Sequence, residues 1–165
     1  MAGLNSASDH AKLALILLGV SGLFFIIAFG APYWSTRSDG RAGLWEGCVD
    51  GVCYERWNQW VVGWVKVCQG FMTFAFICWF FSGFCTLIYV LHKDHENDKR
   101  LVCAACILIS VAAFCVFVAV VTWVSNATFS KGEVLNWAYA VACAVFPVFG
   151  FTGYILLREL RRRIK

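Results

Sequence analysis

Long stretches of apolar residues dominate this chain, and short polar segments separate them. Four such stretches occupy residues 13–31, 67–91, 101–124 and 134–157. A helix rises about 1.5 Å per residue, so about 20 apolar residues are needed to cross a hydrocarbon core of roughly 30 Å. The pattern predicts four transmembrane helices joined by outer loops at 32–66 and 125–133 and an inner loop at 92–100.

Composition supports lipid as the main solvent. Of the 165 residues, 61% are hydrophobic and only 15% are charged, which is too much apolar surface for a water-soluble core. The spans take up more than half of the chain, so residues 1–165 are expected to form a single domain without a soluble catalytic module. We therefore expect a membrane protein that is not an enzyme and that uses no cofactor.

The distribution of lysine and arginine predicts the orientation. With the N-terminus inside, the inner segments carry Lys12, Lys93, Lys99, Arg100, Arg158, Arg161, Arg162, Arg163 and Lys165. The outer loops carry Arg37, Arg41, Arg56, Lys66 and Lys131. This excess places both termini in the cytoplasm of a plasma-membrane protein. The basic tail at 158–165 suits anionic lipid head groups, so the net charge of +4 needs no nucleic acid to explain it.

The first span has one alternative interpretation. Ala28-Phe29-Gly30 loosely fits the cleavage site of a signal peptide. The apolar core is longer than that of a signal, however, and cleavage would leave three spans with the basic tail on the outer side. We therefore expect an uncleaved helix.

Small residues recur within the spans and favour a compact antiparallel four-helix bundle. No Asp, Glu, Lys, Arg or His lies in the middle of a span. Because ion paths, proton relays and transport sites usually contain ionisable groups within the membrane, this absence argues against a transporter or a pore through the bundle.

The first outer loop contains a strong hairpin signal. Asp50-Gly51 lies between Val49 and Val52, as is typical of a two-residue type I′ turn. Such a turn places Cys48 opposite Cys53 with Cα atoms roughly 4.5 Å apart, within the range of a disulfide. A second Asp-Gly pair, at 39–40, completes a predicted sheet of three short antiparallel strands. This loop is expected outside, where disulfides persist.

The motif in this loop resembles that of the claudin superfamily, which includes the peripheral myelin, epithelial membrane and lens intrinsic membrane proteins. It consists of Trp34 just beyond the first span, then Gly43-Leu44-Trp45, then Cys48 and Cys53. The resemblance covers all four spans. It implies that Trp34 and Trp45 anchor the outer sheet to the bundle. Lys66 stands where many relatives carry a basic residue at the outer end of the second span.

The chain departs from claudins proper in three ways. Its first outer loop is shorter, its cysteines are separated by only four residues, and its tail ends in Arg163-Ile164-Lys165, so no PDZ ligand is evident. Loop length and cysteine spacing are closer to the lens and epithelial membrane proteins. Residues 136–139 are similar to the start of the fourth span in the desmosome-associated branch.

The remaining motifs have simpler interpretations. Trp57, Trp60 and Trp64 are expected in an interfacial aromatic belt. Cys85, Cys103 and Cys106 lie near the cytoplasmic ends of spans and are candidates for palmitoylation, and Asn126 begins a glycosylation sequon close to the third span. The spacing of His92 and His95 before the Cys103/Cys106 pair suggests zinc or thiol exchange, but these cysteines start a helix that enters lipid on the reducing side. We expect no metal.

Two functions follow from the resemblance. The first is adhesion or a paracellular barrier at cell contacts, through sheet edges that meet a second copy or a related four-span protein. The second is an accessory subunit that binds a channel or receptor laterally. The absence of long tails and PDZ ligands favours the first.

Overall fold

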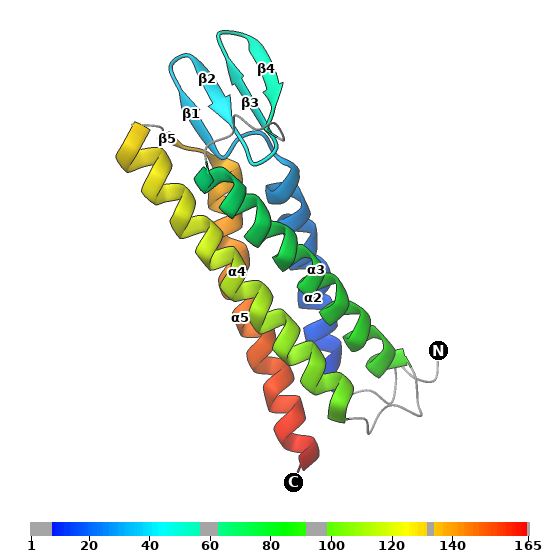
Figure 1. Cartoon of the computed structure of the whole chain (residues 1–165). Coiled ribbons are helices and arrows are strands. Elements are labelled where there is room, and N and C mark those ends of the chain that lie inside the picture. The colour runs from blue at the N-terminus through cyan, green and yellow to red at the C-terminus, as the bar shows by residue number, and fades with distance from the viewer. Residues whose placement is uncertain (1–7, 57–62, 92–98, 132–133, 165) are drawn as a thin grey trace.

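The computed structural model describes residues 8–56, 63–91, 99–131 and 134–164. Its four long helices are α2 (Asp9–Gly30), α3 (Gly63–Leu91), α4 (Lys99–Lys131) and α5 (Trp137–Ile164). All four are long and apolar enough to span a membrane, and they form the bundle in Figure 1. A small sheet caps one end of this bundle, and the start of α2 and the end of α5 lie at the other end (Figure 1). The predicted multi-pass membrane architecture is confirmed.

Two helices extend beyond the predicted spans. Helix α4 continues to Lys131 rather than ending at 124, and α5 continues to Ile164 through most of the basic tail. In the extension of α4, Ser125 Oγ donates to the Val121 carbonyl and Asn126 Nδ2 donates to the Thr122 carbonyl, each at 2.8 Å. Hydropathy marks the apolar part of a helix, whereas backbone hydrogen bonds continue beyond it, which explains the difference.

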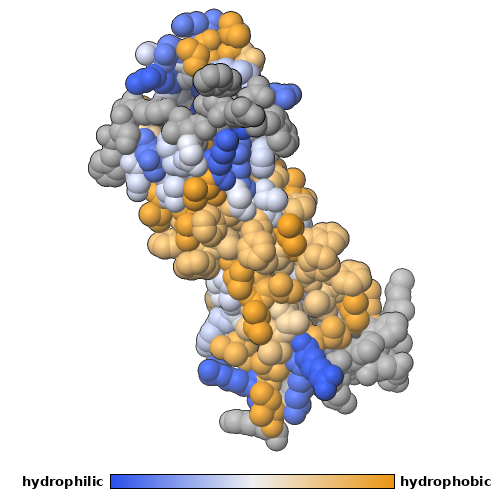
Figure 2. Space-filling view, viewed as in Figure 1, coloured by the Kyte–Doolittle hydropathy of each residue, from blue (hydrophilic) through white to orange (hydrophobic). Residues whose placement is uncertain are grey.

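Alanines line much of the interior of the bundle beside a few large side chains such as Phe25 and Phe149, and many other large side chains face outward. Ala75, Ala112 and Ala142 are fully buried, whereas Phe80 and Phe114 are more than half exposed. Figure 2 shows the resulting hydrophobic band over the helices. Polar side chains form hydrogen bonds between the helices. Trp79 Nε1 of α3 donates to the Leu18 carbonyl of α2 at 3.0 Å, and Ser82 Oγ donates to the Ala105 carbonyl of α4 at 2.8 Å. Such interhelical bonds replace the hydrophobic drive that lipid does not supply.

A buried carboxyl group lies near the end of the bundle that is remote from the sheet. Glu159 of α5 is 0% exposed, and Tyr89 Oη of α3 donates to its Oε1 at 2.9 Å. The sequence pattern places this acid at the edge of the fourth span and gives no sign of its burial.

The sheet has five antiparallel strands in the order β4-β3-β2-β1-β5. The strands are β1 (Ser35–Arg37), β2 (Gly40–Ala42), β3 (Glu46–Val49), β4 (Val52–Glu55) and β5 (Val134–Leu135). The prediction of three strands was wrong. The expected middle strand is interrupted after Ala42, and β5 comes from residues predicted to begin the fourth span and pairs with β1. The segment after α2 and the segment before α5 therefore build one sheet.

Candidate functional site

The end of α2 meets the base of the sheet through two tryptophans. The last carbonyls of a helix lack partners within the helix. Here Ala31 N donates to the Ile27 carbonyl at 3.0 Å, Trp34 Nε1 donates to the Ala28 carbonyl at 2.7 Å, and Trp45 Nε1 donates to the Phe29 carbonyl at 2.8 Å. Two indole groups from the segment after α2 thus supply partners for two of the last carbonyls of this helix.

Trp34 is also the centre of an aromatic cluster. Its ring is fully buried and lies 4.9 Å from that of Trp123 on α4 and 6.1 Å from that of Tyr139 on α5, measured between centroids. Trp64 of α3 contacts Trp123 at 5.2 Å. Aromatic pairs at such distances contribute about 0.5–1.5 kcal/mol beyond area burial. The cluster joins the base of the sheet to three helices.

Gly43 and Leu44 form the break between β2 and β3. A Cβ on Gly43 would lie 2.5 Å from Pro32 Cα and 2.6 Å from the Ala31 carbonyl oxygen, so only glycine fits this approach of two backbones. Leu44 is fully buried. The break explains why the expected single strand is divided, because the chain turns here to insert Leu44 into the core.

The structure adds Gln69 to this site, a residue that the sequence analysis did not select. Its Nε2 donates to the Leu44 carbonyl at 2.7 Å and to the Arg56 carbonyl at 3.1 Å. One α3 side chain therefore holds the start of β3 and the end of β4. An amide among apolar residues of the second span was the available signal. We call Trp34, Gly43, Leu44, Trp45 and Gln69 the seam.

The hairpin β3–β4 has the predicted geometry. Asp50 and Gly51 have φ angles of 51° and 79°, as a type I′ turn requires. Cys48 pairs with Cys53 in the strand register, and the predicted disulfide joins them with a Cα–Cα distance of 4.0 Å. The disulfide is confirmed.

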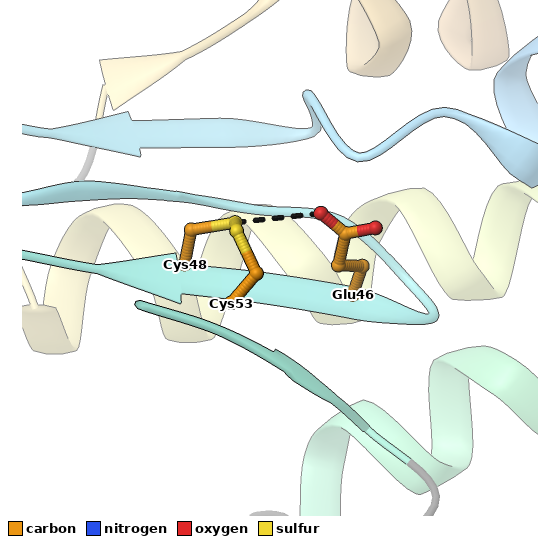
Figure 3. Close-up of side chains that lie close together, drawn as sticks. All are labelled: Glu46, Cys48 and Cys53. Atoms are coloured by element: carbon orange, nitrogen blue, oxygen red, sulfur yellow. Dashed lines mark hydrogen bonds between the residues drawn. A yellow bond between two sulfur atoms is a disulfide. The ribbon is translucent and has the colours of Figure 1, made fainter. Parts of the chain in front are cut away.

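A charged network lies beside the disulfide. Glu46 Oε1 lies 3.4 Å from the disulfide sulfur of Cys48, as Figure 3 shows, and 3.2 Å from Arg41 Nη2. Arg41 Nη1 donates to Tyr33 Oη at 2.7 Å. The hydrogen bond to Glu46 is the main cause of a raised pKa for Arg41. Glu46, Cys48 and Cys53 are close enough to suggest metal ligands, but a disulfide offers no thiolate to a metal.

The other predicted site residues lie apart from the seam. Lys66 is exposed on the first turns of α3, toward the sheet. Cys85, Cys103 and Cys106 are half-buried, and Cys106 Sγ donates to the Gly153 carbonyl of α5 at 3.4 Å. Asn126 lies within α4. The residues outside the described part of the chain are Trp57, Trp60, His92 and His95.

This chain matches no protein-family model, and no curated protein matches it. The features that bear on function are therefore the sheet, the seam and the bundle.

Proposed function

We propose that this chain is a claudin-like membrane protein of cell-cell contacts that acts without catalysis, through its sheet, in adhesion or in a paracellular barrier. The observation that carries the proposal is the edge of the sheet at β4, which is free of a further strand among the described residues. All four residues of β4 are exposed, and Val52 is 69% exposed. An edge strand presents unpaired N–H and C=O groups that pair readily with another strand. Here the edge is held in shape by the disulfide.

The proposal includes an orientation. The sheet lies outside the cell and both termini are cytoplasmic, in the plasma membrane. The disulfide supports this orientation because the outer compartment is oxidising. Exposed Arg158, Arg161 and Arg162 at the opposite end of α5 suit an inner leaflet rich in anionic lipid.

Charge on the sheet predicts weak selectivity for ions between cells. Arg37, Arg41 and Arg56 oppose Asp39, Glu46, Asp50 and Glu55, so three positive and four negative charges leave minus one. A field this small hardly distinguishes cations from anions.

An epithelial layer that lacks the protein tests the proposal. Its loss should lower transepithelial resistance and raise the passage of uncharged tracers, and the wild-type chain should restore both. Val52→Lys, which puts a charge on the free edge, should not restore them. Ile164→Lys is the matched control, because Ile164 is 63% exposed at the opposite end. Unchanged resistance and tracer flux after loss of the protein would refute the proposal.

A second candidate function is lateral binding of a channel or receptor. Its support is an apolar groove of about 390 Å³ between α2 and α5, walled by Leu17, Val20, Phe24 and Val148 among others. A neighbouring transmembrane helix fits such a groove. Co-purification of a specific channel or receptor in mild detergent, abolished by Val20→Trp, would favour this function.

A further inference from the structure

One face of the sheet has a hollow where several neighbouring residues have small side chains. The strand register places Ser35, Ala42, Gly47 and Tyr54 side by side, on the face opposite to the disulfide. A hollow of about 130 Å³ lies against the strands on this face, with exposed Arg37 and Val49 among its lining residues. Since a water molecule occupies about 30 Å³ in the liquid, this space fits one short polar side chain.

Arg56 supplies a cation with an unused donor to this hollow. Its side chain crosses Gly47, where an added Cβ would lie 2.9 Å from Arg56 Nε and 3.1 Å from the Tyr54 ring. Arg56 Nη1 is buried, and no described residue accepts a hydrogen bond from it. A buried donor without an acceptor costs about 1–3 kcal/mol, or more when charged. The Arg56 guanidinium carbon lies 6.0 Å from the centroid of the Trp123 ring, but among the described residues Nη1 has no acceptor. A carboxylate is the group that best matches a guanidinium.

The other charges around the hollow leave it positive. Arg41 also lines it, but its guanidinium is bonded to Glu46 and Tyr33. By formal charge the lining carries Arg37, Arg41 and Arg56 against Asp39, and with the Arg41–Glu46 pair counted as neutral this leaves one net positive charge.

The tip of hairpin β3–β4 presents a complementary group. Asp50 is exposed at the turn, between Val49 and Val52, which are 41% and 69% exposed. The Asp39 carbonyl accepts from Asp50 N at 2.8 Å and braces the turn. Figure 1 places this turn at the end of the sheet farthest from the helices. The tip is thus a rigid acidic projection directed away from the bundle.

We propose that the hollow binds a carboxylate, and that its occupant is Asp50 of a second copy of this chain in a facing membrane. Asp50 of each copy enters the hollow of the other, so one two-fold axis relates two identical contacts. The inference rests on the proposed contact function and names the partner and the contact.

Clustering of proteoliposomes tests this pairing without cells. The full-length chain is reconstituted in phosphatidylcholine vesicles, and clustering is followed by light scattering. Wild-type vesicles should cluster, less so at high salt. Asp50→Asn or Arg56→Gln vesicles alone should lose clustering by about tenfold or more, as expected for a buried charge pair. Mixing the two variants should restore a substantial part, because each supplies what the other lacks and one of the two contacts re-forms.

Matched variants separate the contact from folding and from charge. Glu55→Gln and Lys66→Gln remove one acid and one base outside the hollow and should cluster as the wild type does. Arg37→Gln changes an exposed residue of the hollow and should weaken clustering without lowering the unfolding temperature. Failure of wild-type vesicles to cluster, normal clustering of the single variants, or no gain on mixing would each overturn the pairing. The transepithelial resistance and tracer flux of an epithelial layer test the contact function separately, since they are measured after loss of the whole protein.

Discussion

At the scale of single residues, the seam supplies hydrogen-bond donors to backbone carbonyls that would otherwise lack partners near a membrane. Carbonyls at a helix end need partners, and water is scarce close to hydrocarbon. Trp34 and Trp45 supply two of these partners from outside the helix, and Gln69 supplies donors to two loop carbonyls. Side chains, rather than sheet pairing alone, thus fix the sheet on the bundle.

Trp34→Phe should cost more stability than Trp45→Phe. Both changes keep an aromatic ring and remove one N–H, but Trp34 is fully buried and Trp45 is half-buried. The Ala28 carbonyl would be left without a donor, at about 1–3 kcal/mol, whereas water can partly replace the donor to the Phe29 carbonyl. Unfolding midpoints in detergent measure the difference. Equal or negligible losses would contradict the proposed capping role.

Gln69→Leu should loosen the sheet while leaving the helices formed. Loss of its amide leaves the Leu44 and Arg56 carbonyls without their side-chain donor, at about 1–3 kcal/mol each where water cannot enter. Thr73→Val is the control, because among the described residues the exposed Thr73 hydroxyl bonds to its own helix, at the Gln69 carbonyl. Hydrogen exchange of the β3 and β4 amides should quicken in Gln69→Leu alone. Equal exchange in both variants would exclude Gln69 as a clamp.

At the scale of elements, the hairpin β3–β4 is fixed locally and the rest of the sheet is fixed from a distance. The Asp50-Gly51 turn and the disulfide set its register whatever the bundle does. Strands β2 and β5 instead depend on contacts with the end of α2 and with β1.

Removal of the disulfide should affect β4 more than the bundle. Replacing both Cys48 and Cys53 with serine opens a loop with a sequence separation of only 5, which corresponds to about 2 kcal/mol in the chain-entropy model. Far-ultraviolet circular dichroism should retain the helical signal, and proteolysis near Glu55 should increase. A collapse of helix content would show that the disulfide holds the whole fold.

The same division explains what could be predicted from sequence. The spans and the hairpin follow from patterns within a few neighbouring residues. The break at Gly43 and Leu44, strand β5 and the role of Gln69 arise from contacts across 11 to about 100 residues, such as Gly43 with Pro32 and Ser35 with Leu135. A local pattern can mark a residue such as Gln69, but it does not specify the distant partner of that residue. The extension of α4 to Lys131 was missed because polar residues there continue the helix after the apolar stretch has ended.

At the scale of the whole molecule, the sheet lies at one end of the bundle, and the start of α2 and the end of α5 lie at the opposite end (Figure 1). Because of this arrangement, the sheet and the opposite end of the bundle face different sides of the membrane, and two orientations are possible. We expect Ser38→Cys, at an exposed turn of the sheet, to react with an impermeant maleimide on intact cells. Ile164→Cys should react only after permeabilisation, and the unmodified chain gives the background of its native thiols. The reverse labelling pattern would overturn the orientation.

The most direct test of the central claim is the distribution of a tagged copy in cells that do not normally adhere. Expressing and non-expressing cells are mixed, and fluorescence is compared at each kind of contact. If the sheet engages a second copy, the protein should gather where two expressing cells touch and stay even where an expressing cell touches a non-expressing one. An even distribution over free membrane and both kinds of contact would contradict the account.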